Sequence, residues 1–382
     1  MTPREILARL VAFPTVSRDS NLPLLDFVEE HLRAHGVAAT RVPSDDGVKA
    51  NLHATIGPAV PGGVVLSGHT DVVPVDGQPW DTDPFQLTAR GGRLHGRGAC
   101  DMKAFCAIAL SLVPEMKRLR RPIHLALSYD EEVGCLGAPR LIRDLLARVP
   151  PPAAVLVGEP TEMRVMTAHK GIAVFRTIVT GHEAHSSQTH RGVSAVMTAA
   201  RLITWLDDQA RARQVETPAG SGFEPPWTTI HVGTVHGGTA FNIISRRCEL
   251  CWDVRNVPGD DPAAIAAELQ RYAEAHLAPE MRRIAAGTGV ETAPLVSAPA
   301  LRDEPESAAA VLAKSLTGET VTGKVPFSTE AGLFQEAGLP AVVCGPGSID
   351  QAHQPNEYIT VEQLDAGEAF LRRLIARLSA DP

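Results

Sequence analysis

The sequence predicts an α/β protein in which an α/β/α domain, built on a mixed and mainly parallel sheet, is interrupted by a smaller α+β domain. Three observations lead to this expectation. The chain has 382 residues, which is more than one hydrophobic core usually supports. Short apolar runs alternate with helical patterns over residues 1–169 and again over 295–382, as in sheets covered by helices. Residues 170–294 between them follow a different order of strands and helices.

The larger domain is predicted from apolar runs that have the length of buried strands. These runs occupy residues 63–67, 123–128, 153–157 and 341–344. Helical patterns occupy residues 104–113 and 361–378. In sheets of this class, ligands gather beyond the carboxyl ends of the strands. Polar residues that directly follow these runs are therefore the first candidates for a functional site.

The inserted segment reads as strand, helix, strand, strand and helix. These elements are expected at residues 172–180, 192–208, 228–235, 246–255 and 262–277. No strong metal-type group of residues occurs inside this segment. The functional site is therefore expected in the larger, discontinuous domain.

Composition excludes several classes of partner. The chain carries 44 acidic and 36 basic residues, a formal net charge of -8, and no basic run, which argues against a nucleic-acid partner. No apolar stretch approaches the roughly 20 residues that span a bilayer, so no membrane partner is expected. Six scattered cysteines show no disulfide framework. We expect a cytoplasmic protein with reduced thiols.

Five separate segments each supply one acid or histidine in a setting that suits a metal ligand. The candidates are His69, Asp101, Glu132, Glu159 and His353. Two imidazoles and three carboxylates match the ligand preference of zinc, and a carboxylate can bridge two ions. The sequence thus predicts a centre for two divalent cations and metal-assisted hydrolysis. Zinc is the expected metal, and cobalt or manganese would accept the same ligands.

Roles for individual residues follow from their spacing. Asp71 stands two residues after His69 in an extended segment, so its side chain can support the second ring nitrogen of the imidazole. Asp101 is the only acid in its loop, which makes it the candidate bridging carboxylate. Glu131 and Glu132 follow a strand and should point in different directions. One of the two can bind metal while the other acts as a general base.

Each segment taken alone also has an ordinary structural explanation. The first could be a surface His69 with a turn-capping Asp71, and Asp101 could be a helix N-cap. The adjacent glutamates could be solvated acids at the start of a helix. His353 could simply face solvent. The occurrence of all five segments in one chain favours the metal centre.

Together these segments closely resemble the M20 family of metallopeptidases and deacylases, and within it the acetylornithine deacetylase branch. The resemblance covers nearly the whole chain. It rests on Gly-His-Thr-Asp at 68–71, Asp-Met-Lys at 101–103, Glu-Glu at 131–132, Gly-Glu-Pro-Thr at 158–161, Gly-Pro-Gly-Ser at 345–348, Ala-His-Gln-Pro at 352–355 and Glu-Tyr at 357–358. One departure is Ala104, where the family usually has glycine.

The resemblance implies specific partners for each cation. His69, Asp101 and Glu159 would hold one ion, and Asp101, Glu132 and His353 the other. Asp71 would support His69, and Glu131 would be the general base.

The resemblance also implies that residues 170–294 form a lid through which the chain makes a homodimer. His185 matches a lid histidine that reaches the neighbouring subunit's site and stabilises the oxyanion. Asn242 and Arg255 match positions that contact substrate, and a guanidinium suits a bidentate grip on a carboxylate.

The expected activity is removal of an acyl group from the α-nitrogen of an amino acid, with N-acetylornithine, an intermediate of arginine biosynthesis, as the first candidate. Succinyl-diaminopimelate, acetylcitrulline and peptide carboxypeptidase substrates are alternatives within the family. Glu330 could meet an ornithine ammonium, or it could belong to a capped helix start. A non-catalytic binding protein on the same fold is an alternative of another class, but it would be expected to lose a ligand or the base.

Overall fold

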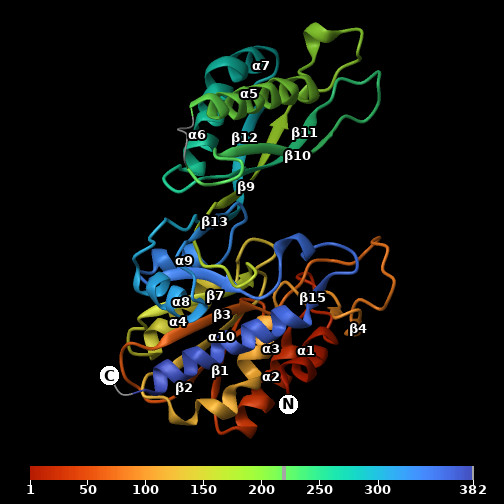
Figure 1. The fold of residues 1–382 in the computed structure, drawn as a ribbon. Coiled ribbons are helices and arrows are strands. Elements are labelled where there is room, and N and C mark those ends of the chain that lie inside the picture. Colours follow the sequence, from red (N-terminus) through yellow and green to blue (C-terminus); the bar gives the residue numbers. More distant parts are fainter. Residues whose placement is uncertain (217–220, 381–382) are drawn as a thin grey trace. The chain divides into compact units, whose positions relative to one another are not determined.

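The computed structural model describes residues 1–216 and 221–380, which divide into two compact units (Figure 1). Unit 1 comprises residues 1–168, 301–324 and those from 329 onward, and unit 2 comprises residues 169–300 and 325–328. The inserted segment was expected to end at residue 294. Unit 2 continues to Ala300 instead, because one strand pairs within this unit as far as Ala298.

An eight-stranded sheet forms the centre of the larger unit. In spatial order its strands are β1 (Ala39–Pro43), β2 (Ala50–Ile56), β6 (Ile123–Ser128), β3 (Val64–His69), β7 (Ala154–Pro160), β14 (Ala341–Gly345), β8 (Met166–His169) and β13 (Gly323–Val325). The four strands from β6 to β14 are parallel, whereas β1, β2 and β8 pair antiparallel with their neighbours. The predicted mixed, mainly parallel sheet is thus confirmed.

Helices cover both faces of this sheet. The chain passes from β3 through α3 (Lys103–Ser111) to β6 on one side, and from β6 through α4 (Ala138–Arg148) back past β3 to β7. Because such crossovers are right-handed, two that run in opposite directions lie on opposite faces. The other helices of this unit are α1 (Pro3–Val11), α2 (Leu22–Ala34), α8 (Ala308–Thr317), α9 (Ala331–Glu336) and α10 (Val361–Ser379).

A small three-stranded sheet joins two distant parts of the chain in unit 1. It consists of β4 (Thr88–Arg90), β5 (Arg93–His95) and β15 (Tyr358–Thr360), with β5 in the middle. Tyr358 pairs with His95 in antiparallel register. The sheet therefore brings the segment after β5 next to the segment before β15.

Unit 2 is an antiparallel sheet backed by helices. Its strands lie in the order β10 (Thr229–Gly237), β11 (Arg247–Arg255), β9 (Ile172–Thr180) and β12 (Gly289–Ala298). Its helices are α5 (Ala195–Glu216), α6 (Pro262–Tyr272) and α7 (Ala278–Ile284). Buried and more exposed residues alternate along β9 and β11, so one face of the sheet packs on the helices. On that face Phe175 stacks on Trp252, with ring centroids 4.6 Å apart.

Candidate metal centre

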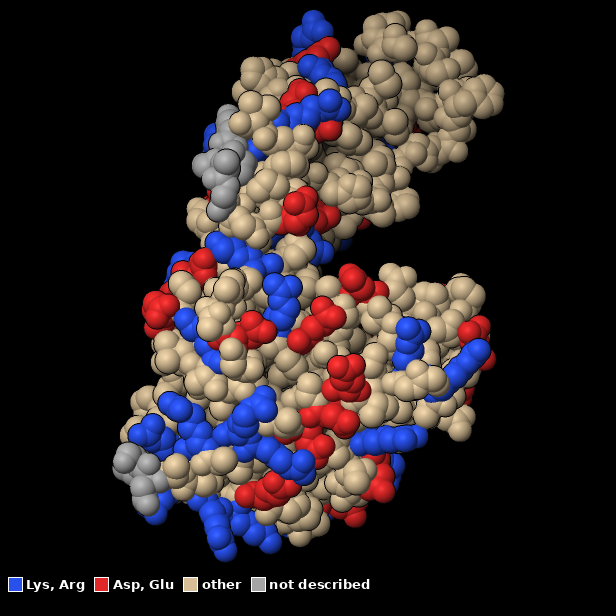
Figure 2. Space-filling view, viewed as in Figure 1, with Lys and Arg blue, Asp and Glu red and all other residues tan. Residues whose placement is uncertain are grey.

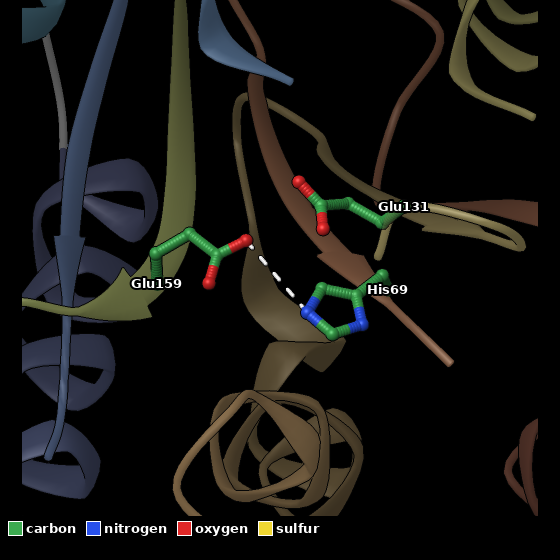
Figure 3. A group of neighbouring side chains, drawn as sticks. All are labelled: His69, Glu131 and Glu159. Carbon is green, nitrogen blue, oxygen red and sulfur yellow. Dashed lines mark ion pairs between the residues drawn. The ribbon is translucent and has the colours of Figure 1, made fainter. Parts of the chain in front are cut away.

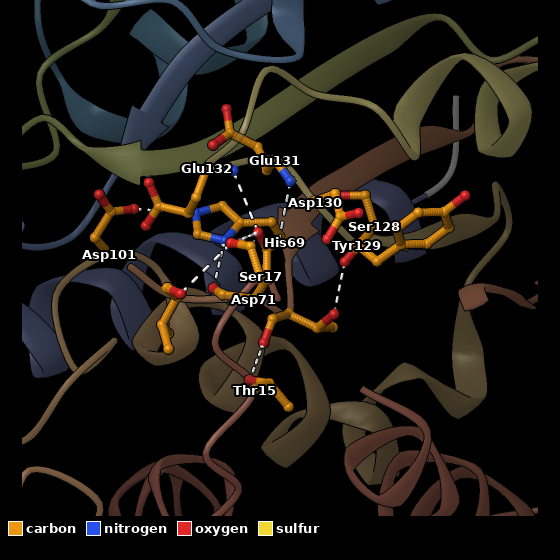
Figure 4. A network of polar contacts seen from close by, with 12 residues as sticks. Thr15, Ser17, His69, Asp71, Asp101, Ser128, Tyr129, Asp130, Glu131 and Glu132 are labelled. Carbon is orange, nitrogen blue, oxygen red and sulfur yellow. Dashed lines mark hydrogen bonds and ion pairs between the residues drawn. The ribbon is translucent and has the colours of Figure 1, made fainter. Parts of the chain in front are cut away.

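The parallel strands bring the predicted ligands to one edge of the large sheet. His69 is the last residue of β3, and Glu159 lies near the end of β7. Glu131 and Glu132 follow β6 after two intervening residues. The carboxyl ends of parallel strands meet at the same edge of a sheet, so these side chains converge (Figures 3 and 4).

The His69 ring is oriented by its own strand end. Its Nδ1 lies 2.9 Å from the main-chain carbonyl oxygen of Asp71, to which it can donate a hydrogen bond. Its Nε2 then faces the cluster, 3.0 Å from Asp101 Oδ1 and 3.7 Å from Glu159 Oε1 (Figure 3). The ring is fully buried. A donated Nδ1 proton fixes the tautomer in which Nε2 is free to bind a cation.

The Asp71 side chain was expected to support the second ring nitrogen of His69, but the main-chain carbonyl of Asp71 accepts that hydrogen bond instead. Its Oδ1 lies 3.7 Å from His69 Nδ1, farther than the main-chain carbonyl. The carboxylate also accepts hydrogen bonds from the backbone N–H groups of Glu131 at 3.1 Å and Glu132 at 3.3 Å (Figure 4). It therefore links the His69 strand to the loop that carries both glutamates.

Two sets of donor atoms are close enough to surround a cation. Within the described residues, the side chains of His69, Glu131 and Glu159 form one group of ligand atoms within 4.8 Å of one another, and those of His69, Asp101 and Glu132 form another. All belong to the predicted cluster. Glu131 is one of the donors, so its assignment as an unligated base stays a prediction.

His353 completes the cluster from a loop after β14. Its Nε2 lies 2.9 Å from Glu132 Oε2 and 3.4 Å from Asp101 Oδ2. Its side chain is 52% exposed, whereas those of Asp101 and Glu132 are 7% and 6% exposed. The structure thus brings together all five predicted ligands and Glu131.

The electrostatics of the cluster fit divalent cations. Burial, followed by repulsion from Asp101, raises the pKa of Glu132 to about 7. The same two causes raise the pKa of Glu159 well above its usual range. Hydrogen bonds to Asp101 and Glu132 raise the pKa of His353 to about 10. Buried carboxylates that repel one another become stable anions when cations neutralise them, and imidazole nitrogen with carboxylate oxygen is a donor set that such cations accept.

The helix-end roles that Asp101 and the two glutamates could have had do not match the structure. Helix α3 begins at Lys103 with Met102 at the N-cap, so Asp101 does not cap it. The next helix after the glutamate pair begins only at Ala138. Ala104 is fully buried within α3, in the hydrophobic core.

Some of the polar contacts that support the cluster could not be predicted from the sequence. Lys49 Nζ donates to both carboxylate oxygens of Asp130, at 2.6 and 2.8 Å, and to the carbonyl oxygen of Ser17. The Ser17 hydroxyl in turn donates to Asp71 Oδ2 at 2.7 Å. These four residues come from four distant segments, so only the tertiary fold shows that they support the glutamate loop.

Glu330 belongs to a capped helix start, as one of the two alternatives expected, although the cap comes from its neighbour Thr329. Its side chain is 1% exposed, and its Oε2 accepts a hydrogen bond from Ser67 Oγ at 2.7 Å. It stands at the N-cap position of α9 but makes no side-chain cap. Thr329 Oγ1 instead accepts from the Ala331 N–H at 3.0 Å. The Glu330 carboxylate thus packs against β3.

The predicted lid residues lie at two ends of the unit 2 sheet. His185 is exposed, its Nδ1 is 2.8 Å from Ser187 Oγ, and it forms a β-bridge with Ile243, next to the exposed Asn242. Arg255 is the last residue of β11 and lies 3.5 Å from Asp253. The rest of β11 separates it from the turn that carries Asn242, about 25 Å at strand rise.

No helix in the described part of the chain is long and apolar enough to cross a membrane.

Comparisons with known proteins agree with this geometry. Residues 65–377 match the model of peptidase family M20/M25/M40. An acetylornithine deacetylase from Myxococcus xanthus is 36% identical, over 98% of this chain and 96% of its own. One from Pasteurella multocida is 32% identical, over 98% and 97%.

Solved structures share the fold. A metallo-carboxypeptidase of the M20 family from Sulfolobus solfataricus aligns with a TM-score of 0.75 at 18% identity, covering 99% of both chains. A dinuclear metal-binding peptidase of that family from Bacillus subtilis aligns with a TM-score of 0.65 at 16% identity, covering 98% and 97%. The resemblance drawn from the sequence motifs is confirmed: the chain belongs to the M20/M25/M40 peptidase family and is a metal-dependent hydrolase.

Proposed function

We propose that the chain removes an acyl group from the α-nitrogen of an amino acid, with N-acetylornithine as its substrate. One observation carries the hydrolytic part of this proposal: six acidic and histidine side chains from five separate segments of the chain gather at one sheet edge. The substrate rests on relatives named acetylornithine deacetylase, which are 32–36% identical over nearly the whole chain. The product ornithine would serve arginine biosynthesis in the cytoplasm.

His69, Asp101 and Glu159 would hold one divalent cation, and Asp101, Glu132 and His353 the other. Zinc suits this donor set, as cobalt and manganese also do. When bound, such cations polarise an amide carbonyl and lower the pKa of water toward about 7.

Glu131 would act as the general base. It would take a proton from the attacking water and deliver it to the amine that leaves. Asp71 supports this role because its carboxylate holds the Glu131 backbone N–H. Desolvation raises the pKa of Glu131 well above its usual range, which strengthens this carboxylate as a base.

The lid residues would serve substrate from two subunits. His185 would stabilise the oxyanion that forms in the neighbouring subunit's site. Asn242, which lies near His185, would contact the substrate in that same site. Arg255 would bind the substrate carboxylate. Since β11 separates Arg255 from Asn242 by about 25 Å, one small substrate cannot touch both within one chain. This separation supports a homodimer in which each site uses residues of both copies.

Exposed apolar residues support the same homodimer. Met197 on α5 is 69% exposed, and Phe241, in the turn after β10, is fully exposed. β10 is an edge strand, and residues 232–245 contain no Lys, Arg, Asp or Glu. Figure 2 shows a broad uncharged surface on one end of unit 2. A second copy would cover such a face.

A substrate panel tests the proposal. Purified protein should hydrolyse N-acetylornithine faster than acetylcitrulline, succinyl-diaminopimelate or dipeptides, and a chelator should abolish the activity. Recovery on adding back zinc, cobalt or manganese identifies the metals that work. If the protein prefers another substrate in the panel, the proposal of N-acetylornithine as substrate is wrong, but the proposal of a hydrolase stands. No turnover with any of them in the metal-loaded protein would favour a binding protein on the same fold.

A further inference from the structure

A buried carboxylate outside the proposed ligand set holds the loop that carries Asp101. Glu357 is 1% exposed and lies just before β15. Its Oε1 accepts hydrogen bonds from the N–H groups of Cys100 at 2.8 Å and Asp101 at 3.1 Å. Its Oε2 accepts one from Gly98 at 3.0 Å. A single side chain thus fixes three backbone groups of the Asp101 loop.

Arg97 connects this loop to the segment that carries His353. Its guanidinium is 1% exposed, and Nη1 donates to Glu357 Oε2 at 2.7 Å. Nη1 also lies 3.3 Å from the carbonyl oxygen of Gln354, and Nη2 donates to Gln78 Oε1. The guanidinium carbon lies 5.1 Å from the centroid of the Trp80 ring.

Gln78 continues the connection to His353 itself. Its Nε2 donates to the carbonyl oxygen of His353 at 2.9 Å. His353 has a φ of 63°, in the left-handed region that non-glycine residues seldom adopt. A hydrogen bond to its carbonyl therefore helps to keep a backbone conformation that the residue would otherwise leave.

The three side chains meet because of the small sheet. β5 pairs with β15, and the Gly96 N–H donates to the Glu357 carbonyl at 2.9 Å. This pairing places residues far apart in sequence side by side. None of the three is among the side chains grouped as candidate metal ligands in the described part of the chain.

We propose that Gln78, Arg97 and Glu357 form a positioning brace that fixes Asp101 and His353 relative to each other and thereby sets the affinity for the second cation. The inference rests on the proposed metal centre, in which Asp101 and His353 hold that cation together with Glu132. Affinity depends on the distance between donors, and these two ligands come from separate loops. Partners that orient the ligands of a metal typically contribute about 10- to 100-fold to its affinity.

Gln78→Ala is the first test, because this side chain is only half-buried and its loss leaves the Arg97–Glu357 pair intact. Stripped full-length protein is titrated with zinc and with cobalt by calorimetry. We expect the second cation to bind about 10- to 100-fold more weakly, while the first binds as in the wild type. Gln86→Ala is the matched control, since Gln86 is exposed on the same segment of unit 1. It should bind both cations normally.

Glu357→Gln tests the other side of the brace. Because Asp101 is proposed to touch both cations, this variant should weaken both, whereas Glu362→Gln, at an exposed position of α10, should weaken neither. Circular dichroism of the cation-free proteins checks folding. If Glu357→Gln does not fold, the Gln78→Ala titration still tests whether the brace sets the affinity for the second cation.

The outcomes separate the brace from the metal centre. If the wild type binds two cations and Gln78→Ala binds both with unchanged affinity, the brace is wrong and the centre stands. If the wild type binds fewer than two, the proposed centre fails, and the brace with it. Equal weakening of both cations by Gln78→Ala would also overturn the brace, because it would indicate a general structural defect.

Discussion

Glu131 and Glu132 are adjacent in the sequence, yet their carboxylates have different partners. Glu132 Oε2 lies 2.9 Å from His353 Nε2, whereas Glu131 Oε1 lies 3.3 Å from the thiol of Cys135. The Asp71 carboxylate holds the backbone N–H of both. Hydrogen bonds to Asp71 therefore fix the backbone of the pair, while the two side chains point to different partners. Separate roles for a base and a ligand would require such an arrangement.

Replacing Glu131 by Gln should keep both cations and lower kcat by ~10² to 10⁴, the usual effect of losing a general base. Metal content and steady-state rates of the same preparation measure this. Glu132→Gln is the contrast, since it should lose a cation as well as activity. Loss of a cation from Glu131→Gln would instead identify Glu131 as a ligand, in the group that it forms with His69 and Glu159.

Asp101→Ala should prevent tight binding of both cations, because this residue alone is proposed to touch both. Glu159→Ala and His353→Ala should each weaken mainly one. Titration of zinc into the three stripped variants compares them directly. Tight binding of two cations by Asp101→Ala would rule out the bridging role.

At the scale of secondary-structure elements, the sequence was most informative where a strand ends. The rule that ligands follow the carboxyl ends of parallel strands located His69, Glu131, Glu132 and Glu159 without any tertiary information. The supporting contacts could not be predicted in this way. Glu357 meets Gly98 and Asp101 only because β5 pairs with β15 across more than 250 residues of chain, and no local pattern records such a pairing.

One strand of the large sheet also carries a buried histidine with consequences for acid stability. His124 on β6 is fully buried, and its Nε2 has no hydrogen-bond partner among the described residues. Burial, with a smaller contribution from the charge of His53, lowers the pKa of His124 to about 4. The unfolded chain takes up this proton near pH 6.5. The unfolded state thus binds more protons between about pH 6.5 and 4, and His124 reduces stability as the pH falls through this window.

His124→Gln should therefore flatten the dependence of the free energy of unfolding on pH between about 6.5 and 4. Urea unfolding of the variant and the wild type at several pH values measures the two slopes. His35→Gln, at a half-buried position of unit 1, is the control. Identical slopes for His124→Gln and the wild type would show that His124 is protonated in the folded protein.

For the whole molecule, the two units carry different kinds of evidence. The predicted ligands all lie in unit 1 and converge there, so a single copy of the chain supplies every ligand of the proposed metal centre. His185 and Asn242 are exposed and lie far from the half-buried Arg255 within unit 2, so the roles proposed for them require a second copy. Sequence motifs identified His185 and Arg255 as candidates only through family resemblance, because an exposed histidine and a charge at a strand end have no distinctive local pattern.

His185→Ala should leave cation binding and dimerisation unchanged and lower turnover by ~10² or more, as expected for the loss of an oxyanion donor. Mixing inactive His185→Ala with inactive Glu131→Gln should restore part of the activity. A mixed dimer would contain one site with an intact base and an intact histidine from the other copy. Mixed dimers that form and remain inactive would contradict action across the interface.

The order of the ligands along the chain has a consequence during synthesis. His69, Glu131 and Glu159, which form one donor group, have all been made by residue 159. His353 and the interior strand β14 are made only after the whole of the inserted segment 170–294. A nascent chain that stops within residues 170–294 thus carries one complete donor group but lacks His353, a proposed ligand of the second cation. Ribosome-bound chains of this length would therefore differ from the finished protein in metal content.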